Sequence, residues 1–305
     1  MKKNLLTKKI VIGITILFLG ASIIPSISGH VDISNKPNSE QPFKLRGRGT
    51  LYVGGGGPDN YSKIQDAIDD ANPGDTIFVY DDSAPYNENL FIEKSIDIIG
   101  EKKETTIIDG GYDLQVIWLI ANIVTISNFT LRDAEIGLIG ITNGSIISDI
   151  IISCQQAGIG LMNSTNNQII NNEVKSGYDI GIGIFDSSNN NVISNNVISN
   201  TYIGLYIAVK CYFNKIFSNI VKQSSKYGIW IHWSFLNLVT KNNFIDNGCN
   251  AYFENSSFNL WFKNYWDDWS SSRPRPIEGI RYGPILKTTD PWKTYDLRPA
   301  KAPYD

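Results

Sequence analysis

The chain has 305 residues, of which 42% are hydrophobic and 19% are charged, and its formal net charge is −3 at neutral pH. It contains 47 Ile and 31 Asn. The Ile content excludes low-complexity disorder, because such segments lack the apolar residues needed for a core. An acidic chain has no basic footprint for phosphates, so we expect no nucleic-acid partner.

The first 28 residues have the pattern of a secretory signal. Four lysines within the first nine residues precede an apolar run from Ile10 to Ile24, and small residues follow up to Gly29. This run is shorter than the ~20 residues of a membrane span. We therefore predict a signal peptide over residues 1–28, with an uncleaved anchor as the alternative, and no membrane span after signal removal. The predicted localisation is secreted or cell surface.

Residues 29–57 are rich in Asn, Pro, Ser and Gly and show no apolar periodicity. Such composition is typical of a flexible tether on the surface.

A short repeat runs through the centre of the chain. A Gly or Asn precedes alternating apolar residues six times, at spacings of 21 to 24 residues. The members of this turn column are Gly137, Gly158, Gly181, Gly204, Gly228 and Asn250. A fixed period of this length predicts a solenoid, in which these residues stack at strand spacing. Gly and Asn are the residues that enter the left-handed region most easily, so we expect most of them to have positive φ.

After each member of the turn column, every second residue is apolar. These residues form two columns, which begin at Leu138 and Leu161, and they predict the inner face of short strands. Half a repeat away, Asn residues fall into one register and predict an amide ladder along the axis. Its expected members are Asn196, Asn219, Asn243 and Asn264. Parallel stacking of such repeats gives a β-helix over residues 58–269, with roughly eight or nine coils at strand spacing.

Both ends of a solenoid need covering, because an open end exposes core and unpaired strand groups. Ser62 to Gln65 form a capping-box pattern, and apolar residues at helical spacing follow as far as Ala71. We predict an amphipathic cap helix there. Residues 270–305, rich in Pro and aromatic residues, are the predicted C-terminal cap or tail.

Several segments carry a resemblance to a known family: residues 61–71, residues 73–79, Tyr86 to Glu88, and Asn264 to Asp267. The chain resembles the right-handed parallel β-helix repeat proteins of the pectin-lyase-like superfamily. It is nearest the periplasmic copper-protein (NosD-type) group, whose exported members are numerous in archaea. The resemblance implies an all-β, single-stranded right-handed parallel β-helix. This scaffold hosts lyases, hydrolases, epimerases, binding modules and structural proteins, so function must be argued from the site.

Catalytic groups are hard to find in the repeats. No Arg occurs between Gly137 and Trp269, and only Asp267 and Asp268 adjoin among scattered acidic residues. Glycoside hydrolysis needs two carboxylates ~5 to 9.5 Å apart, and no repeat column supplies them. We predict no catalytic residues, with a polysaccharide lyase or glycoside hydrolase of unrecognised site as the alternative.

Soft metal ligands are also sparse. Beyond the predicted signal they are His30, His232, Met162, Cys154, Cys211 and Cys249. The cysteines stand at different offsets from the turn column, so we interpret them as small buried hydrophobes. No metal and no cofactor are predicted.

One outer column is aromatic in three successive repeats. Its members, two residues after the turn column, are Tyr206, Trp230 and Tyr252, with His232 and Glu254 two residues further along the same face. Stacked aromatic rings suit the apolar face of a sugar, so these five residues are the candidate carbohydrate-binding site, and a polysaccharide or glycoprotein is the expected partner. The alternative is that the tail folds back over this strip with Tyr282, Trp292 and Tyr295.

The sequence leaves three hypotheses for the function. The first is a secreted or cell-surface β-helix protein, not catalytic, that binds or scaffolds carbohydrate. The second is the polysaccharide enzyme above, and the third is a structural envelope protein.

Overall fold

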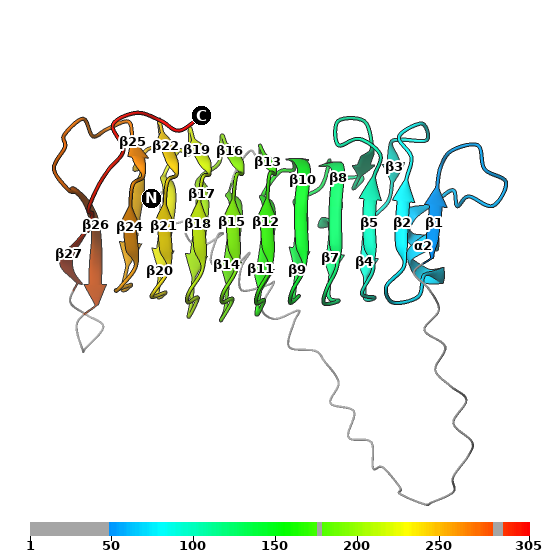
Figure 1. The fold of residues 1–305 in the computed structure, drawn as a ribbon, viewed down its shortest axis with the longest axis horizontal. Coiled ribbons are helices and arrows are strands. Elements are labelled where there is room, and N and C mark those ends of the chain that lie inside the picture. The colour runs from blue at the N-terminus through cyan, green and yellow to red at the C-terminus, as the bar shows by residue number, and fades with distance from the viewer. Residues whose placement is uncertain (1–48, 176–178, 283–288) are drawn as a thin grey trace, which may run out of the picture. The chain divides into compact units, whose positions relative to one another are not determined.

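The computed structural model describes residues 49–175, 179–282 and 289–305, and residues 46–305 belong to one compact unit. Within this unit the strands stack in parallel as a β-solenoid (Figure 1). The predicted all-β parallel solenoid is therefore confirmed. The predicted signal peptide and most of the predicted tether lie outside the described residues.

Three parallel ladders of strands build the solenoid. The first ladder consists of β4 (Leu90–Ile92), β7 (Gln115–Leu119), β9 (Ile136–Gly140), β11 (Ala157–Met162), β14 (Ile180–Phe185), β17 (Ile203–Ala208), β20 (Tyr227–His232), β23 (Ala251–Glu254) and β26 (Arg275–Tyr282). The second consists of β1 (Thr50–Val53), β2 (Thr76–Val79), β5 (Asp97–Gly100), β8 (Thr125–Arg132), β10 (Ile146–Ser153), β12 (Gln168–Ile170), β15 (Val192–Ser194), β18 (Lys215–Phe217), β21 (Leu238–Thr240) and β24 (Leu260–Phe262).

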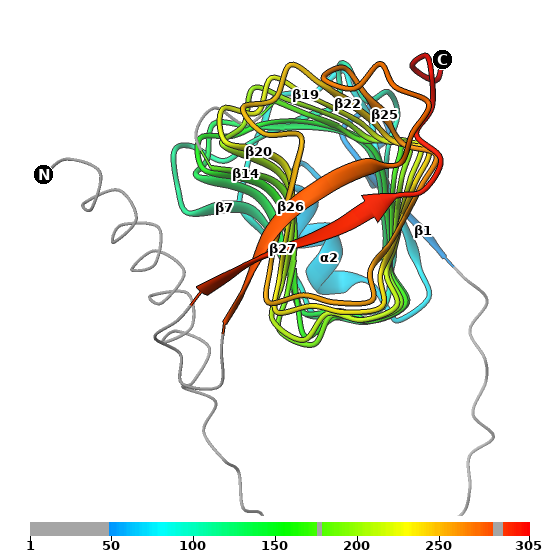
Figure 2. The same cartoon turned by 90° about the vertical axis from the view of Figure 1, so that its left-hand side faces the viewer.

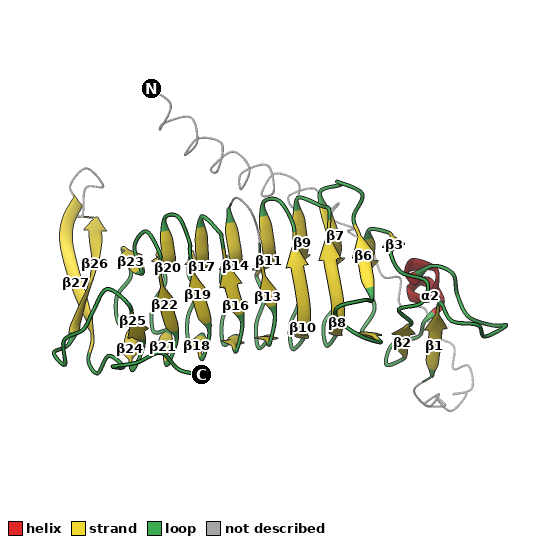
Figure 3. Ribbon diagram, turned by 90° about the horizontal axis from the view of Figure 1, so that it is seen from above, coloured by secondary structure: helices red, strands yellow, loops and turns green. Residues whose placement is uncertain are grey.

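The third ladder consists of β3 (Tyr86–Asn87), β6 (Ile107–Asp109), the second halves of β8 and β10, β13 (Glu173–Val174), β16 (Val197–Ser199), β19 (Ile220–Lys222), β22 (Asn243–Ile245) and β25 (Tyr265–Trp266). The second ladder has ten strands, so the solenoid has ten coils rather than the expected eight or nine. Viewed along the stack, the coils superimpose, with the first and second ladders on opposite sides (Figure 2). Figure 3 shows the same strands side by side along the stack.

The turn column stacks as predicted, but its backbone is not left-handed. None of its six members is among the described residues with positive φ. A Cβ on Gly158 would lie 2.5 Å from the carbonyl oxygen of Gly181 and 2.3 Å from a methyl group of Val174 in the third ladder. The equivalent glycines meet the next coil and a third-ladder residue in the same way. The expectation of positive φ was wrong, because glycine is needed here for close approach between ladders.

The interior is a continuous apolar core, and the predicted inward columns that begin at Leu138 and Leu161 are fully buried. Two amide ladders run beside this core. The first contains Asn172, Asn196, Asn219, Asn242 and Asn264, and each member accepts hydrogen bonds from the backbone and side-chain N–H groups of the one before. The predicted ladder therefore exists, with Asn242 in place of Asn243. A second ladder that was not predicted contains Asn167, Asn191, Asn214, Asn237 and Asn259.

The single described helix, α2 (Ile64–Asp70), lies at the N-terminal end of the stack (Figure 2) and buries Ile64, Ala67 and Ile68 in the core. The predicted capping box does not form, because its N-cap is Lys63 and no side chain of the helix caps it. Instead Glu88 accepts hydrogen bonds from the first two backbone N–H groups, at 2.8 and 2.9 Å. Strand β1 pairs with β2, so ordered structure begins inside the segment predicted as a tether.

At the other end, the tail forms β26 and the antiparallel strand β27 (Thr289–Asp296), which cross the end of the stack (Figure 2). The carboxylate of Asp296 is fully buried and ends the first amide ladder. It accepts hydrogen bonds from both N–H groups of Asn264, from the backbone of Lys263 and Arg298, and from the indole of Trp266.

Candidate functional site: an outer aromatic face

The outward side chains of the first ladder form a column with one member on each of its nine strands. The strand registers place its members in the order Phe91, Trp118, Ile139, Gly160, Gly183, Tyr206, Trp230, Tyr252 and Glu278. The predicted strip is therefore one column, as expected. It belongs to a longer column whose first two residues, on β4 and β7, are also aromatic.

The rings of the strip contact one another closely. Tyr206 and Trp230 stack with ring centroids 4.7 Å apart, and Tyr252 stacks at 5.0 Å on Tyr227, a residue that sequence reasoning missed. Phe185 approaches Tyr206 edge-on at 5.6 Å. We call these five rings the aromatic face. They do not form a bare ladder, because Tyr206 is only 8% exposed and anchors a second hydrophobic cluster outside the core.

Polar groups line one edge of the aromatic face. The hydroxyl of Tyr206 lies 3.2 Å from Nδ1 of His232, and Nε2 of His232 lies 3.9 Å from a carboxylate oxygen of Glu254. Burial lowers the pKa of His232, and the nearby Glu254 opposes this effect. Burial also raises the pKa of Tyr206. The Tyr206 hydroxyl thus stays protonated at neutral pH, so it is a hydrogen-bond donor and a poor base.

The opposite edge carries a cation and an unpaired donor. The ammonium group of Lys226 lies 5.4 Å from the ring centre of Trp230 and 5.0 Å from that of Tyr227. The indole nitrogen of Trp230 is buried and has no hydrogen-bond partner among the described residues. Buried indole N–H groups are normally paired; because this one is covered, an acceptor from outside the chain would reach it only after a neighbouring side chain moves.

In the described part of the C-terminal tail, Tyr282 is the residue that reaches the site. Tyr282 donates a hydrogen bond to Glu254 and stacks on Trp233. Trp292 instead contacts Phe253 at the end of the core, and Tyr295 is exposed. Of the three tail residues predicted to cover the strip, Tyr282 contacts the site, at Glu254, whereas Trp292 and Tyr295 lie elsewhere.

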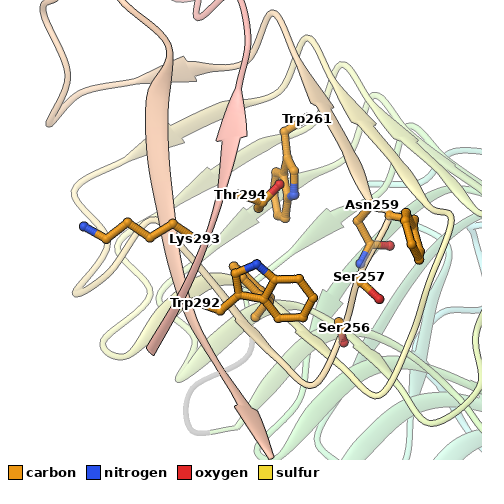
Figure 4. Close-up of a pocket in the computed structure, with 9 residues that line it drawn as sticks. Ser256, Ser257, Asn259, Trp261, Trp292, Lys293 and Thr294 are labelled. Carbon is orange, nitrogen blue, oxygen red and sulfur yellow. The ribbon is translucent and has the colours of Figure 1, made fainter. Parts of the chain in front are cut away.

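A small pocket of about 70 Å³ lies at the C-terminal end, between β27 and the turn before β24 (Figure 4). Trp261 lines it with a buried indole nitrogen that has no partner among the described residues. Ligand pockets usually exceed about 300 Å³. The pocket has room for water rather than for a sugar.

Two carboxylates stand at the C-terminal end of the aromatic face: Glu254 lies beside His232, and Glu278, which follows Tyr252 in the outer column, forms an ion pair with Lys293 at 3.2 Å. The adjacent pair Asp267 and Asp268 is used structurally. Asp267 accepts hydrogen bonds from the backbone of Asp246 and the side chain of Asn250, and Asp268 forms an ion pair with Arg275.

Soft ligands do not gather into a metal site in the described part of the chain, where no group of three or more His, Cys, Asp or Glu could hold an ion. Cys154 and Cys211 are buried free thiols, and desolvation raises the pKa of each to about 12. They stay protonated, whereas copper binds the thiolate. Met162 and His232 share a column but stand three coils apart, about 14 Å at strand spacing.

Parallel coils with side chains in regular columns define the class of this protein as a parallel β-solenoid. The profile of the family described as "Periplasmic copper-binding protein (NosD)" matches residues 68–279. The chain therefore belongs to the NosD family. The donors described above do not fit the copper named in that description. No match is found among curated proteins.

Several solved structures are similar to part of this chain. The A-module of mannuronan C-5 epimerase AlgE4 from Azotobacter vinelandii is 15% identical, with a TM-score of 0.41 over 66% of this chain and 73% of that one. A pectin methylesterase in complex with a hexasaccharide is 13% identical, with a TM-score of 0.42 over 84% and 90%. The PL6 alginate lyase AlyGC is 13% identical, with a TM-score of 0.44 over 66% and 36%. Likenesses at this level say nothing about activity.

In the described residues no helix is long and apolar enough to cross a membrane.

Proposed function

We propose that this protein is an exported, non-catalytic β-solenoid that binds polysaccharide, or the glycan of a glycoprotein, on the aromatic face. Export is supported by the signal pattern of residues 1–28 and by the periplasmic description of the NosD family. Binding is supported by one observation above all: the partly exposed ring of Trp230 stacks on Tyr206 and on His232 on the outer face.

The chemistry of the face suits a sugar. Aromatic rings contact the apolar C–H face of a pyranose, while His232 and Glu254 can exchange hydrogen bonds with its hydroxyl groups. The outer column also continues along the stack to Trp118 and Phe91, whose rings lie 5.7 Å apart and are exposed. A linear chain lying along the stack would contact both aromatic groups.

A glycan array with the chain from residue 29 onward tests the proposal. Tyr252→Ala should weaken binding to any glycan found by roughly five- to 150-fold, on the scale of ~1 to 3 kcal/mol per ring stacked on a base. Tyr212→Ala is the matched control, because Tyr212 also stacks on a neighbour, Phe235 at 6.0 Å, outside the aromatic face. If the array is blank and Trp230→Ala only lowers the melting temperature, the face is structural.

A polysaccharide-modifying enzyme is the second candidate, favoured by the contact between the Tyr206 hydroxyl and His232 beside Glu254. Such a trio resembles an acid–base set. If it acts on the glycan, that glycan should be cleaved or epimerised by the parent protein and left unchanged by His232→Gln. Binding without turnover is the result expected from the first proposal.

A further inference from the structure

One turn position of the solenoid is Asn in two earlier coils but a large apolar residue in the three coils that precede the tail. Asn166 and Asn190 occupy the same left-handed turn position in two earlier coils, with φ of 59° and 56°. The equivalent residues in the next three coils are Phe213, Leu236 and Phe258, with φ of 57° to 59°. Asn adopts this conformation readily, whereas a bulky side chain there is an outlier. These three large apolar residues therefore adopt a left-handed backbone conformation that their side chains disfavour.

These residues belong to an exposed apolar patch. Leu260 lies beside them on β24, and Tyr295 and Leu297 flank Asp296, which pairs with Trp261 of the same strand. The six side chains are between 46% and 76% exposed. Three members of the patch stand two residues before β18, β21 and β24. We call this group the corner patch, and its members are Phe213, Leu236, Phe258, Leu260, Tyr295 and Leu297.

Cations outnumber anions around the corner patch, although Asp305 lines the same pocket as Lys241 and Asp186 interacts electrostatically with Lys210. The segments 210–218, 233–241, 255–263 and 294–298 contain five cationic residues, Lys210, Lys215, Lys241, Lys263 and Arg298. Their only acidic residue is Asp296, which is buried and fully engaged with N–H donors. The whole chain, by contrast, has a net charge of −3. The patch is thus a local cationic and apolar surface on an acidic protein.

We propose that the corner patch docks the protein on an anionic lipid surface. Phe and Leu tips ringed by Lys and Arg have the composition that binds a membrane interface, where apolar side chains enter the acyl boundary and cations contact the head groups. Phe and Leu side chains would offer the hydroxyl groups of a glycan no hydrogen-bonding partners. A second copy would bring two patches of like charge together. Phe213, Leu236 and Phe258 stand in the turns that lead from the first ladder into the second, so the corner patch is separate from the outward column of the first ladder.

Flotation with lipid vesicles tests this docking. The chain from residue 29 is used because it contains the whole compact unit 46–305 and lacks the apolar run Ile10–Ile24, which would itself enter a bilayer. Binding to vesicles of mixed phosphatidylglycerol and phosphatidylcholine should exceed binding to phosphatidylcholine alone and should fall at high salt. Replacing Lys215 or Lys263 by Gln should weaken binding by about fivefold each.

The decisive variant is Phe213→Asn/Leu236→Asn/Phe258→Asn, which restores the residue used by the earlier coils. Its melting temperature should stay equal or rise, because Asn suits the left-handed turn, while vesicle binding should fall by roughly tenfold or more. The matched control is Tyr112→Asn/Ile123→Asn, which removes two exposed apolar residues of positive φ elsewhere and should bind like the parent. Equal binding by the triple variant overturns the proposal, as does light scattering that shows a dimer which this variant dissociates.

Discussion

The inner and outer faces of the first ladder follow different rules. Inward positions repeat almost unchanged from Leu138 to Phe253, and all are buried in one core. Outward positions of the same strands change from Trp118 to Gly160 to Trp230. Repetition on the inner face is what closes a stack of coils, because every coil must fit its neighbours. Side chains on the outer face do not have to fit the neighbouring coils in this way. Positions where they depart from the repeat are therefore candidates for function.

The largest expected effect lies at the end of the inner amide ladder. Asp296→Ala leaves the side chain and backbone of Asn264 and the Trp266 indole without their acceptor. Several unpaired buried donors should lower the free energy of unfolding by about 4 kcal/mol or more, measured by urea denaturation. Asp290→Ala removes an exposed carboxylate of the same strand and should change it little. Equal losses in both variants would contradict the role of Asp296 as the ladder terminus.

Two glycines of the first ladder test the difference between its inner and outer faces. In Gly204→Ala the new methyl group would lie 2.6 Å from the carbonyl oxygen of Gly228 and 2.3 Å from Val221. We expect a loss of about 3 kcal/mol in the free energy of unfolding. In Gly160→Ala the methyl group meets only the Phe185 ring, at 4.0 Å. That variant should be unchanged or about 0.5 kcal/mol more stable, and a similar loss at both sites would refute the inner–outer distinction.

The smallest expected effect concerns pH. Because burial lowers the pKa of His232 in the folded protein, the unfolded chain binds more protons than the folded one below the ordinary His range. The stabilising contribution of neutral His232 is therefore complete above pH ~6.5 and declines as the pH falls toward the folded-state pKa. His232→Gln should lose less melting temperature between neutral and mildly acidic pH than the parent. A steeper loss in the variant would show that Glu254 dominates instead.

Sequence reasoning recovered the solenoid and its columns because period and alternation are properties of residue type. It could not tell why the turn column is glycine, since both a left-handed turn and close approach demand a missing side chain. It also could not choose between two adjacent Asn residues. Asn242 joins the ladder, whereas Asn243 exchanges hydrogen bonds with the backbone of Tyr304, 61 residues away.

The candidate site was predicted only in part. Strict alternation from Trp230 would turn Tyr227 inward, yet Tyr227 lies in the aromatic face. The glycine between them explains this, because Gly228 and Ile229 both face the interior and interrupt the alternation. The burial of Tyr206 likewise depends on rings from other coils. The residue directly before the turn-column glycine is apolar or aromatic in several coils, as in Ile180, Ile203 and Tyr227. This pattern was the signal that could have revealed the wider aromatic face.

The most direct test of the account is the side-chain N–H spectrum of ¹⁵N-labelled tryptophan in the chain from residue 29. Trp230 would be assigned from the signal lost in Trp230→Phe, and Trp266, whose indole donates to Asp296 at 3.1 Å, serves as the internal reference. On addition of a glycan bound on the array, the Trp230 N–H signal should shift because the sugar packs against its ring, while the Trp266 signal stays in place. A Trp230 signal that does not move at saturating glycan would contradict recognition at the aromatic face.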